Sequence, residues 1–189
     1  MTIDDDDDLA LPAALAAIAA LGFGLEADDD DDDADDADVE HRPVDFELFE
    51  EFLDADDTAD WFQAWTGDPD TDGADQFRVF GQTAAGGYAA FWLVRDDAPL
   101  TDQPIVYLGP GGETGVVACD LSAFLWLIAD GSGPYEAVEH PTRRSRPNAE
   151  FTAIAEKHAT GERMTARQAV EAARDEFPDF EDTMAEMTR

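Results

Sequence analysis

The stretch from Phe77 to Gly131 constrains the fold most, because four short strand-like runs lead into one amphipathic helix. The runs are rich in aromatic and β-branched residues and are separated by turn signals. They cover Phe77 to Gln82, Gly87 to Val94, Ile105 to Leu108 and Gly115 to Cys119. The gaps between them are too short for crossover helices, so the strands should pair as an antiparallel meander. Both alternating faces of the second run are apolar, which predicts a central strand covered on both sides.

The helix after these strands has its own start and stop signals. Asp120 is placed to cap the helix, and Gly131 supplies a left-handed residue at its end. Apolar residues recur between the two at helical spacing, including Phe124 and Leu125. We therefore expect an α+β fold, in which an antiparallel meander packs with several α-helices and Phe124 and Leu125 contact the sheet.

Helical spacing also occurs on both sides of this unit. Before it lie six aromatic residues and one leucine that predict an acidic helix packed on the core, with a partner-binding aromatic patch as the alternative. They are Phe46, Phe49, Phe52, Leu53, Trp61, Phe62 and Trp65. After it, Asn148 can cap one helix, and Thr165 with Gln168 forms a capping-box pattern for another. These two C-terminal helices are expected to form an α-hairpin beside the sheet.

The N-terminal part of the chain is unusually acidic. Asp4 to Asp8 and Asp28 to Asp38 are nearly pure aspartate, and such runs cannot repay the entropy of ordering. Between them, Leu9 to Leu25 is too short and too weakly apolar to span a bilayer, so it should form a helix that docks on the domain or on a partner. We expect residues 1–38 to be a partly disordered leader and residues 39–189 to be a single domain, with Asp28 to Asp38 dispensable for folding.

Three segments of the strand region follow one another in a characteristic order. They are Gly86 to Trp92, Pro104 to Gly109 with Gly111 to Glu113, and Val117 to Leu121 with Phe124 and Leu125. Together they resemble the SMI1/KNR4 (SUKH) superfamily, most strongly from Phe46 to Gly131. The resemblance implies a SUKH-like α+β domain. Many bacterial members are immunity proteins that bind and neutralise toxin domains, so it further implies a protein-binding module without catalytic activity, catalytic residues or cofactor.

The overall charge restricts the possible partners. The chain has 46 acidic and 11 basic residues and a net charge of −35, so it repels phosphate backbones and anionic membranes. We expect neither nucleic-acid nor membrane binding, but a basic protein partner such as a toxin domain. The residues chosen as a candidate rim for that partner are Asp54, Asp56, Asp57 and Asp60.

The segment from Asp68 to Gly73 contains the sharpest chemical pattern. Its alternating carboxylates and final glycine match the first half of an EF-hand calcium loop, but the twelfth position is Val79 instead of a bidentate glutamate. Calcium could be held in another geometry by Asp68, Asp70, Asp72 and Asp75. A polar turn that leads into a strand explains the same residues and is the favoured interpretation.

The single cysteine, Cys119, excludes an internal disulfide and favours a cytoplasmic protein. It is interpreted as a small apolar residue at a strand end, because no histidine near it in the sequence could activate it. Three classes of function remain: an immunity protein, an acidic regulatory or calcium-binding protein, and an enzyme, for which the sequence offers no motif.

Overall fold

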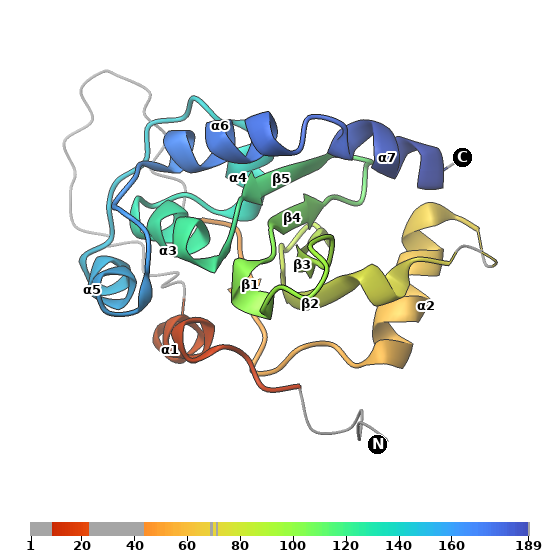
Figure 1. Cartoon of the computed structure of the whole chain (residues 1–189), viewed down its shortest axis with the longest axis horizontal. Coiled ribbons are helices and arrows are strands. Elements are labelled where there is room, and N and C mark those ends of the chain that lie inside the picture. The colour runs from red at the N-terminus through yellow and green to blue at the C-terminus, as the bar shows by residue number, and fades with distance from the viewer. Residues whose placement is uncertain (1–8, 23–43, 69, 71, 189) are drawn as a thin grey trace, which may run out of the picture.

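A computed structural model describes residues 9–22, 44–68, 70 and 72–188 of the chain. The aspartate runs from Asp4 to Asp8 and from Asp28 to Asp38 lie outside the described residues, so their expected disorder stays a prediction. The described part contains a five-stranded sheet surrounded by seven α-helices (Figure 1).

The sheet is an antiparallel meander in which neighbouring strands follow each other in sequence. Its order is β1 (Glu47–Leu48), β2 (Phe77–Gln82), β3 (Tyr88–Trp92), β4 (Ile105–Leu108) and β5 (Thr114–Ala118). The expected α+β class and antiparallel order are thus confirmed. The central strand β3 has two buried faces: Ala89 and Phe91 point to one core cluster, and Ala90 points to the other.

The helix predicted after β5 forms as expected. In α3 (Leu121–Ala129), the carboxylate of Asp120 accepts a hydrogen bond from the amide of Ala123 at 2.7 Å, which satisfies one of the free amides of the first turn. Phe124 and Leu125 are fully buried, and they belong to the same core cluster as sheet residues such as Phe80 and Phe91. Every residue of α3 is buried because other helices cover its outer side.

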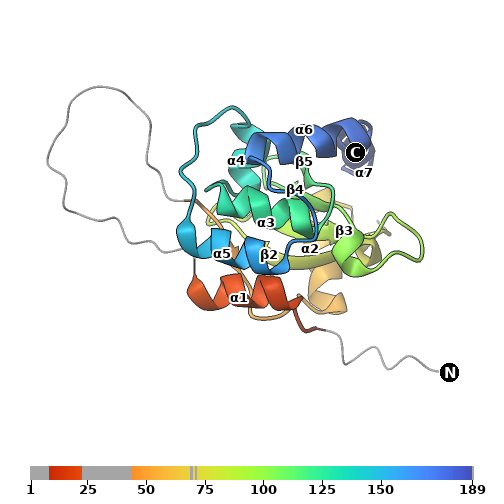
Figure 2. The ribbon, with the colours of Figure 1, turned by 60° about the vertical axis from the view of Figure 1, so that its left-hand side comes forward.

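Four helices lie side by side over this face of the sheet (Figure 2). α1 (Ala13–Leu21) contacts α5 (Ala149–His158), α5 contacts α3, and α3 contacts α6 (Ala166–Glu176). α3 therefore lies between α5 and α6, so the two C-terminal helices do not form the expected α-hairpin. Their predicted caps are present: Asn148 accepts two backbone amides, and Thr165 and Gln168 form a capping box.

The apolar segment of the leader is part of the domain core. Leu15 and Ile18 of α1 are fully buried, together with Leu11 and Ala14. The segment before α1 also pairs with the chain after β1, since the amide of Phe52 donates to the carbonyl of Leu9 at 2.8 Å. Of the two expected docking partners for this segment, the structure shows the domain itself.

The residues between Phe46 and Leu53 correct one expectation. They form an extended edge segment instead of a helix, and α2 begins only at Ala55 and ends at Thr66. The amides of Phe49 and Leu53 donate to carbonyls of β2 at 2.9 and 3.0 Å. Because sheet pairing satisfies this backbone while Phe46 and Phe52 become buried, the extended form is preferred despite the helical spacing of the aromatic residues.

The opposite face of the sheet is covered by α2 and by α7 (Phe180–Met187), a helix that was not expected. α6 and α7 run along the β5 edge, and the short helix α4 (Pro134–Glu139) lies beside the same strand (Figure 1). On this opposite face, α7 lies near β5, whereas α2 covers the part of the sheet near β2 and β3. The side of α2 that points away from the sheet is therefore on the protein surface.

Candidate protein-binding face

The acidic residues chosen from the sequence meet at the beginning of α2. Asp54 is its N-cap, and its carboxylate accepts the amide of Asp57 at 2.8 Å. Asp56 and Asp57 lie in the first turn, where negative charge is stabilised by the helix dipole. All four residues, including Asp60 one turn later, are exposed. Asp54 therefore has a structural role, while the other three carboxylates are presented to solvent.

The chain around α2 has no positive charge of its own. From Val44 to Phe77 the sequence contains acidic residues but no lysine, arginine or histidine. Surface charges are otherwise commonly paired along a helix at i, i+4 spacing, as Arg167 and Glu171 are on α6. The negative potential of this surface must therefore be balanced by solvent ions or by a partner.

Two tryptophans lie next to these carboxylates. Phe62 anchors α2 in the core, whereas Trp61 and Trp65 are only partly buried. The ring centroid of Trp61 lies 4.8 Å from that of Tyr88 and 6.3 Å from that of Trp65. Asp57 and Trp61 are four residues apart, so they share one side of the helix. We define the acidic α2 face by Asp56, Asp57, Asp60, Trp61 and Trp65.

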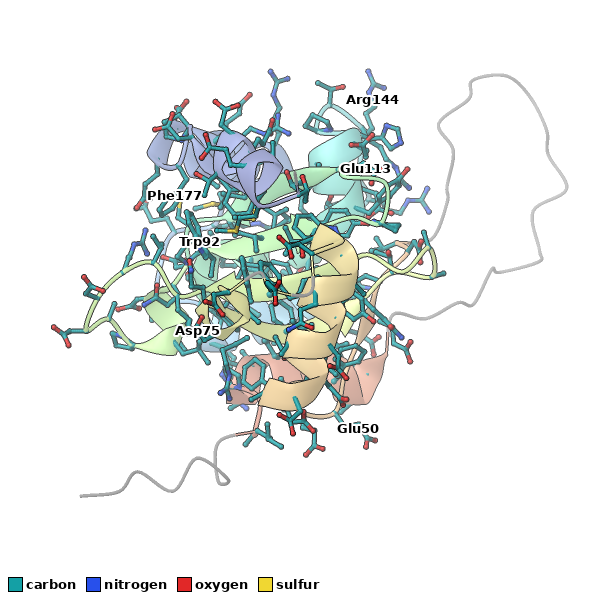
Figure 3. All side chains as sticks on the ribbon, turned by 90° about the vertical axis from the view of Figure 1, so that its right-hand side faces the viewer. Glu50, Asp75, Trp92, Glu113, Arg144 and Phe177 are labelled. Atoms are coloured by element: carbon teal, nitrogen blue, oxygen red, sulfur yellow. The ribbon has the colours of Figure 1, made fainter. Side chains whose placement is uncertain are left out.

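The tryptophans are held in place by the neighbouring elements. The indole N–H of Trp65 donates to the carbonyl of Gly109 in the β4–β5 turn at 2.8 Å. Figure 3 shows α2 in front of the sheet, with Glu113 of the same turn on one side and Trp92 and Phe177 on the other. Phe62 packs in the core and Trp65 is hydrogen-bonded to this turn, so the position of α2 is fixed relative to the sheet. Its outer side is therefore preorganised for binding.

Asp68, Asp70 and residues 72–75 are the described part of the connection from α2 to β2, for which a polar turn was the favoured interpretation. Asp68 Oδ1 accepts the amide of Asp70 at 3.0 Å, and Gly73 adopts a φ of 128° that L-residues with side chains avoid. Within the described residues, no three His, Cys, Asp or Glu side chains gather where they could hold a metal ion. The calcium ligands Asp68, Asp70, Asp72 and Asp75 thus gain no support from this geometry, and calcium binding stays a prediction.

Cys119 lies at the end of β5 beside a charged pair. Burial raises the pKa of its thiol to about 12, and a hydrogen bond to Glu176 and the charge of that carboxylate act in the same direction. Arg95 joins the two by donating to the carbonyl of Cys119 at 3.0 Å and by pairing with Glu176. Although partial burial opposes ionisation, the hydrogen bonds from Arg95 and Cys119 lower the pKa of Glu176. This cluster fastens the end of α6 to the sheet and keeps the thiol protonated.

We expect Cys119 to resist alkylation in the folded protein. At pH 8 a thiol of pKa about 12 is ionised on the order of a thousandfold less than an ordinary cysteine, and the thiolate is the reacting species. The rate with iodoacetamide should therefore be at least ~100-fold lower in buffer than in denaturing urea at the same pH. Equal rates in the two conditions would show that the thiol is activated or freely exposed.

Comparisons of this chain with known proteins identify no relative. The chain matches no protein-family model, no curated protein and no solved structure. Among the described helices, none is both long and apolar enough to cross a membrane. The acidic α2 face therefore has to be interpreted from its own chemistry.

The sequence alone pointed to the carboxylates of the acidic α2 face. It selected Asp54, Asp56, Asp57 and Asp60, and for the nearby tryptophans it favoured core packing, with a partner-binding patch as the alternative. The absence of positive charge from Val44 to Phe77 was the signal that distinguishes this acidic region from the rest of an acidic chain.

Proposed function

We propose that this protein is a binding module without catalytic activity, and that it acts as an immunity protein that neutralises a basic toxin domain by direct contact in the cytoplasm. The observation that carries the proposal is the acidic α2 face, where exposed carboxylates surround partly buried tryptophans and no basic residue lies between Val44 and Phe77. The resemblance to the SUKH superfamily supplies the class of partner.

The two kinds of side chain have different tasks in such a complex. Exposed carboxylates attract a basic partner over about one Debye length, which raises the association rate more than the affinity. Short-range energy comes mostly from a few buried anchor residues, among which tryptophan, tyrosine and arginine are enriched. Trp61 and Trp65 can supply this contact, since an arginine of the partner can also stack on an indole ring.

The test is capture of the partner by the full chain in cells that encode a neighbouring toxin gene. We expect a basic toxin domain to co-purify in a 1:1 complex, and co-expression to protect cells from that toxin. Protection without a stable complex would contradict direct neutralisation. If neither a complex nor protection is found, the acidic regulatory or calcium-binding alternative replaces the proposal.

Neutralising the carboxylates of the acidic α2 face should slow formation of that complex. In the triple variant Asp56→Asn, Asp57→Asn, Asp60→Asn, we expect the association rate at low salt to fall about tenfold, with less than a threefold change in dissociation. Asp54 is left intact so that α2 keeps its cap. Stopped-flow or surface plasmon resonance measurements at several ionic strengths give both rates.

The matched control places the same loss of charge on α7, in the variant Glu181→Gln, Asp182→Asn, Glu186→Gln, because all three residues are exposed there. The control should slow association less than twofold. Equal slowing in the two variants would show that only net charge matters and that α2 is not the binding surface.

A further inference from the structure

The structure contains a small cavity lined by basic residues, in a chain that is otherwise strongly acidic. The cavity has a volume of about 250 Å³ and lies between the end of α3, the start of α6 and the loop after α4. Arg143, Arg144, Arg167 and His140 line it. In Figure 3, Arg144 lies at the far end of the molecule from Glu50, which precedes α2, so the cavity is separate from the acidic α2 face.

Donor groups remain available to a ligand in this cavity. Arg144 is exposed and has no hydrogen bond or ion pair within the described residues. Arg167 uses its Nε for Glu171 at 2.8 Å, so its two terminal nitrogens remain free for another acceptor. Arginine donors in this planar arrangement match the oxygens of a phosphate group.

The cavity wall also contains a serine hydroxyl. Ser132 is 8% exposed and lines the cavity, and its hydroxyl is not one of the buried side-chain atoms that lack a partner in the described part of the chain. A hydroxyl can donate one hydrogen bond to an anion beside it. Ser132 therefore adds a neutral donor to the arginines that line the cavity.

One carboxylate in the wall restricts which anion fits. Asp130 Oδ2 accepts the hydroxyl of Ser145 at 3.2 Å and the amide of Ala166 at 2.8 Å. Its other oxygen, Oδ1, accepts no hydrogen bond from a described residue. An anion beside this carboxylate is repelled unless it also carries a proton that it can donate to Oδ1. Hydrogen phosphate has such a proton at neutral pH, whereas sulfate does not.

We propose that this cavity binds inorganic hydrogen phosphate. Arg144, Arg167 and Ser132 donate to its oxygens, and Asp130 accepts its proton. The volume is below the roughly 300–1,000 Å³ of sites for drug-sized molecules, so only a small group is enclosed. This site does not depend on the proposed immunity function.

Calorimetric titration of the full chain at pH 7 tests the proposal, with ionic strength held constant by sodium chloride. We expect one inorganic phosphate to bind per chain and sulfate to bind at least fivefold more weakly. O-phosphoserine is titrated in parallel. Its phosphate has a second pKa of about 6 and is mostly without a P–OH proton at about pH 7, so it should also bind more weakly than inorganic phosphate. No saturable binding of inorganic phosphate, or equal affinity for sulfate and phosphate, would overturn the proposal.

Two pairs of variants separate a specific site from general charge screening. Arg144→Gln should weaken phosphate binding about tenfold, while Arg146→Gln, the same change at an exposed residue outside the cavity lining, should alter it less than twofold. Ser132→Ala should weaken binding severalfold with little change in overall charge or volume. Equal effects of the two arginine variants would overturn the assignment, and circular dichroism confirms that each variant is folded.

Discussion

A chain that begins at Val39 should be less stable than the full chain by about 5 kcal/mol or more, because it lacks α1. Leu15 and Ile18 of this helix are fully buried, and replacing a single buried leucine or isoleucine by alanine costs about 2–5 kcal/mol. Loss of the whole helix also exposes the apolar residues of α5 and of the sheet edge that it covers. Since domains of this size are stable by only about 5–15 kcal/mol, urea denaturation should show a mostly unfolded truncated chain.

Point variants within α1 give this expectation a matched control. Leu15→Ala should lower the free energy of unfolding by about 2–4 kcal/mol, whereas Leu21→Ala, on the same helix but 46% exposed, should change it by less than about 0.5 kcal/mol. Equal effects would show that α1 does not pack as described. Dispensability of the acidic run is a different question, which deletion of residues 28–38 with α1 retained answers directly.

The expectations that held rest on local chemistry that only one structure satisfies. Asp120 and Gly131 at the two ends of α3, and the capping box of Thr165 and Gln168, each pair backbone groups within a few residues of themselves. The antiparallel order follows equally from short connections, which exclude crossover helices. These features require no knowledge of distant parts of the chain, so the sequence is sufficient for them.

The expectations that failed depend on distant contacts. Phe46, Phe49, Phe52 and Leu53 have helical spacing, yet their segment pairs with β2, whose position is set by the rest of the sheet. The placement of α3 between α5 and α6 is likewise decided by apolar surfaces far apart in sequence. Local spacing cannot rank such alternatives, because the energy that decides between them comes from tertiary burial.

The candidate site divides in the same way. The acidic residues Asp54, Asp56, Asp57 and Asp60 can be read directly from the sequence, although the start of α2 at Ala55 was not predicted. The partial exposure of Trp61 and Trp65 instead depends on how much of each ring is covered by Tyr88 and by the turn at Gly109. The basic cavity is the hardest of these features to predict from the sequence. It brings together Asp130, Ser132, Arg144 and Arg167, which come from three separate segments of the chain.

Replacing Gly131 by alanine should be the most damaging single change at a turn, with an expected loss of about 3–5 kcal/mol in the free energy of unfolding. Gly131 has a φ of 86° and completes the end of α3, where its amide donates to Ile128 and the amide of Ser132 donates to Leu127. An added Cβ would lie 2.0 Å from the carbonyl oxygen of Arg146, a backbone atom that cannot rotate away. Backbone strain and this overlap therefore act together.

A matched substitution at Gly86 distinguishes the backbone strain from the steric overlap. It has a similar φ of 93°, but a Cβ added there has no atom within 4 Å. Gly86→Ala should therefore cost only about 1 kcal/mol, the strain of the left-handed conformation alone. The difference between the two variants in urea denaturation measures the contact between Gly131 and the loop at Arg146. A difference near zero would mean that this loop, which also carries Arg144 of the basic cavity, does not pack on the end of α3 as the structure shows.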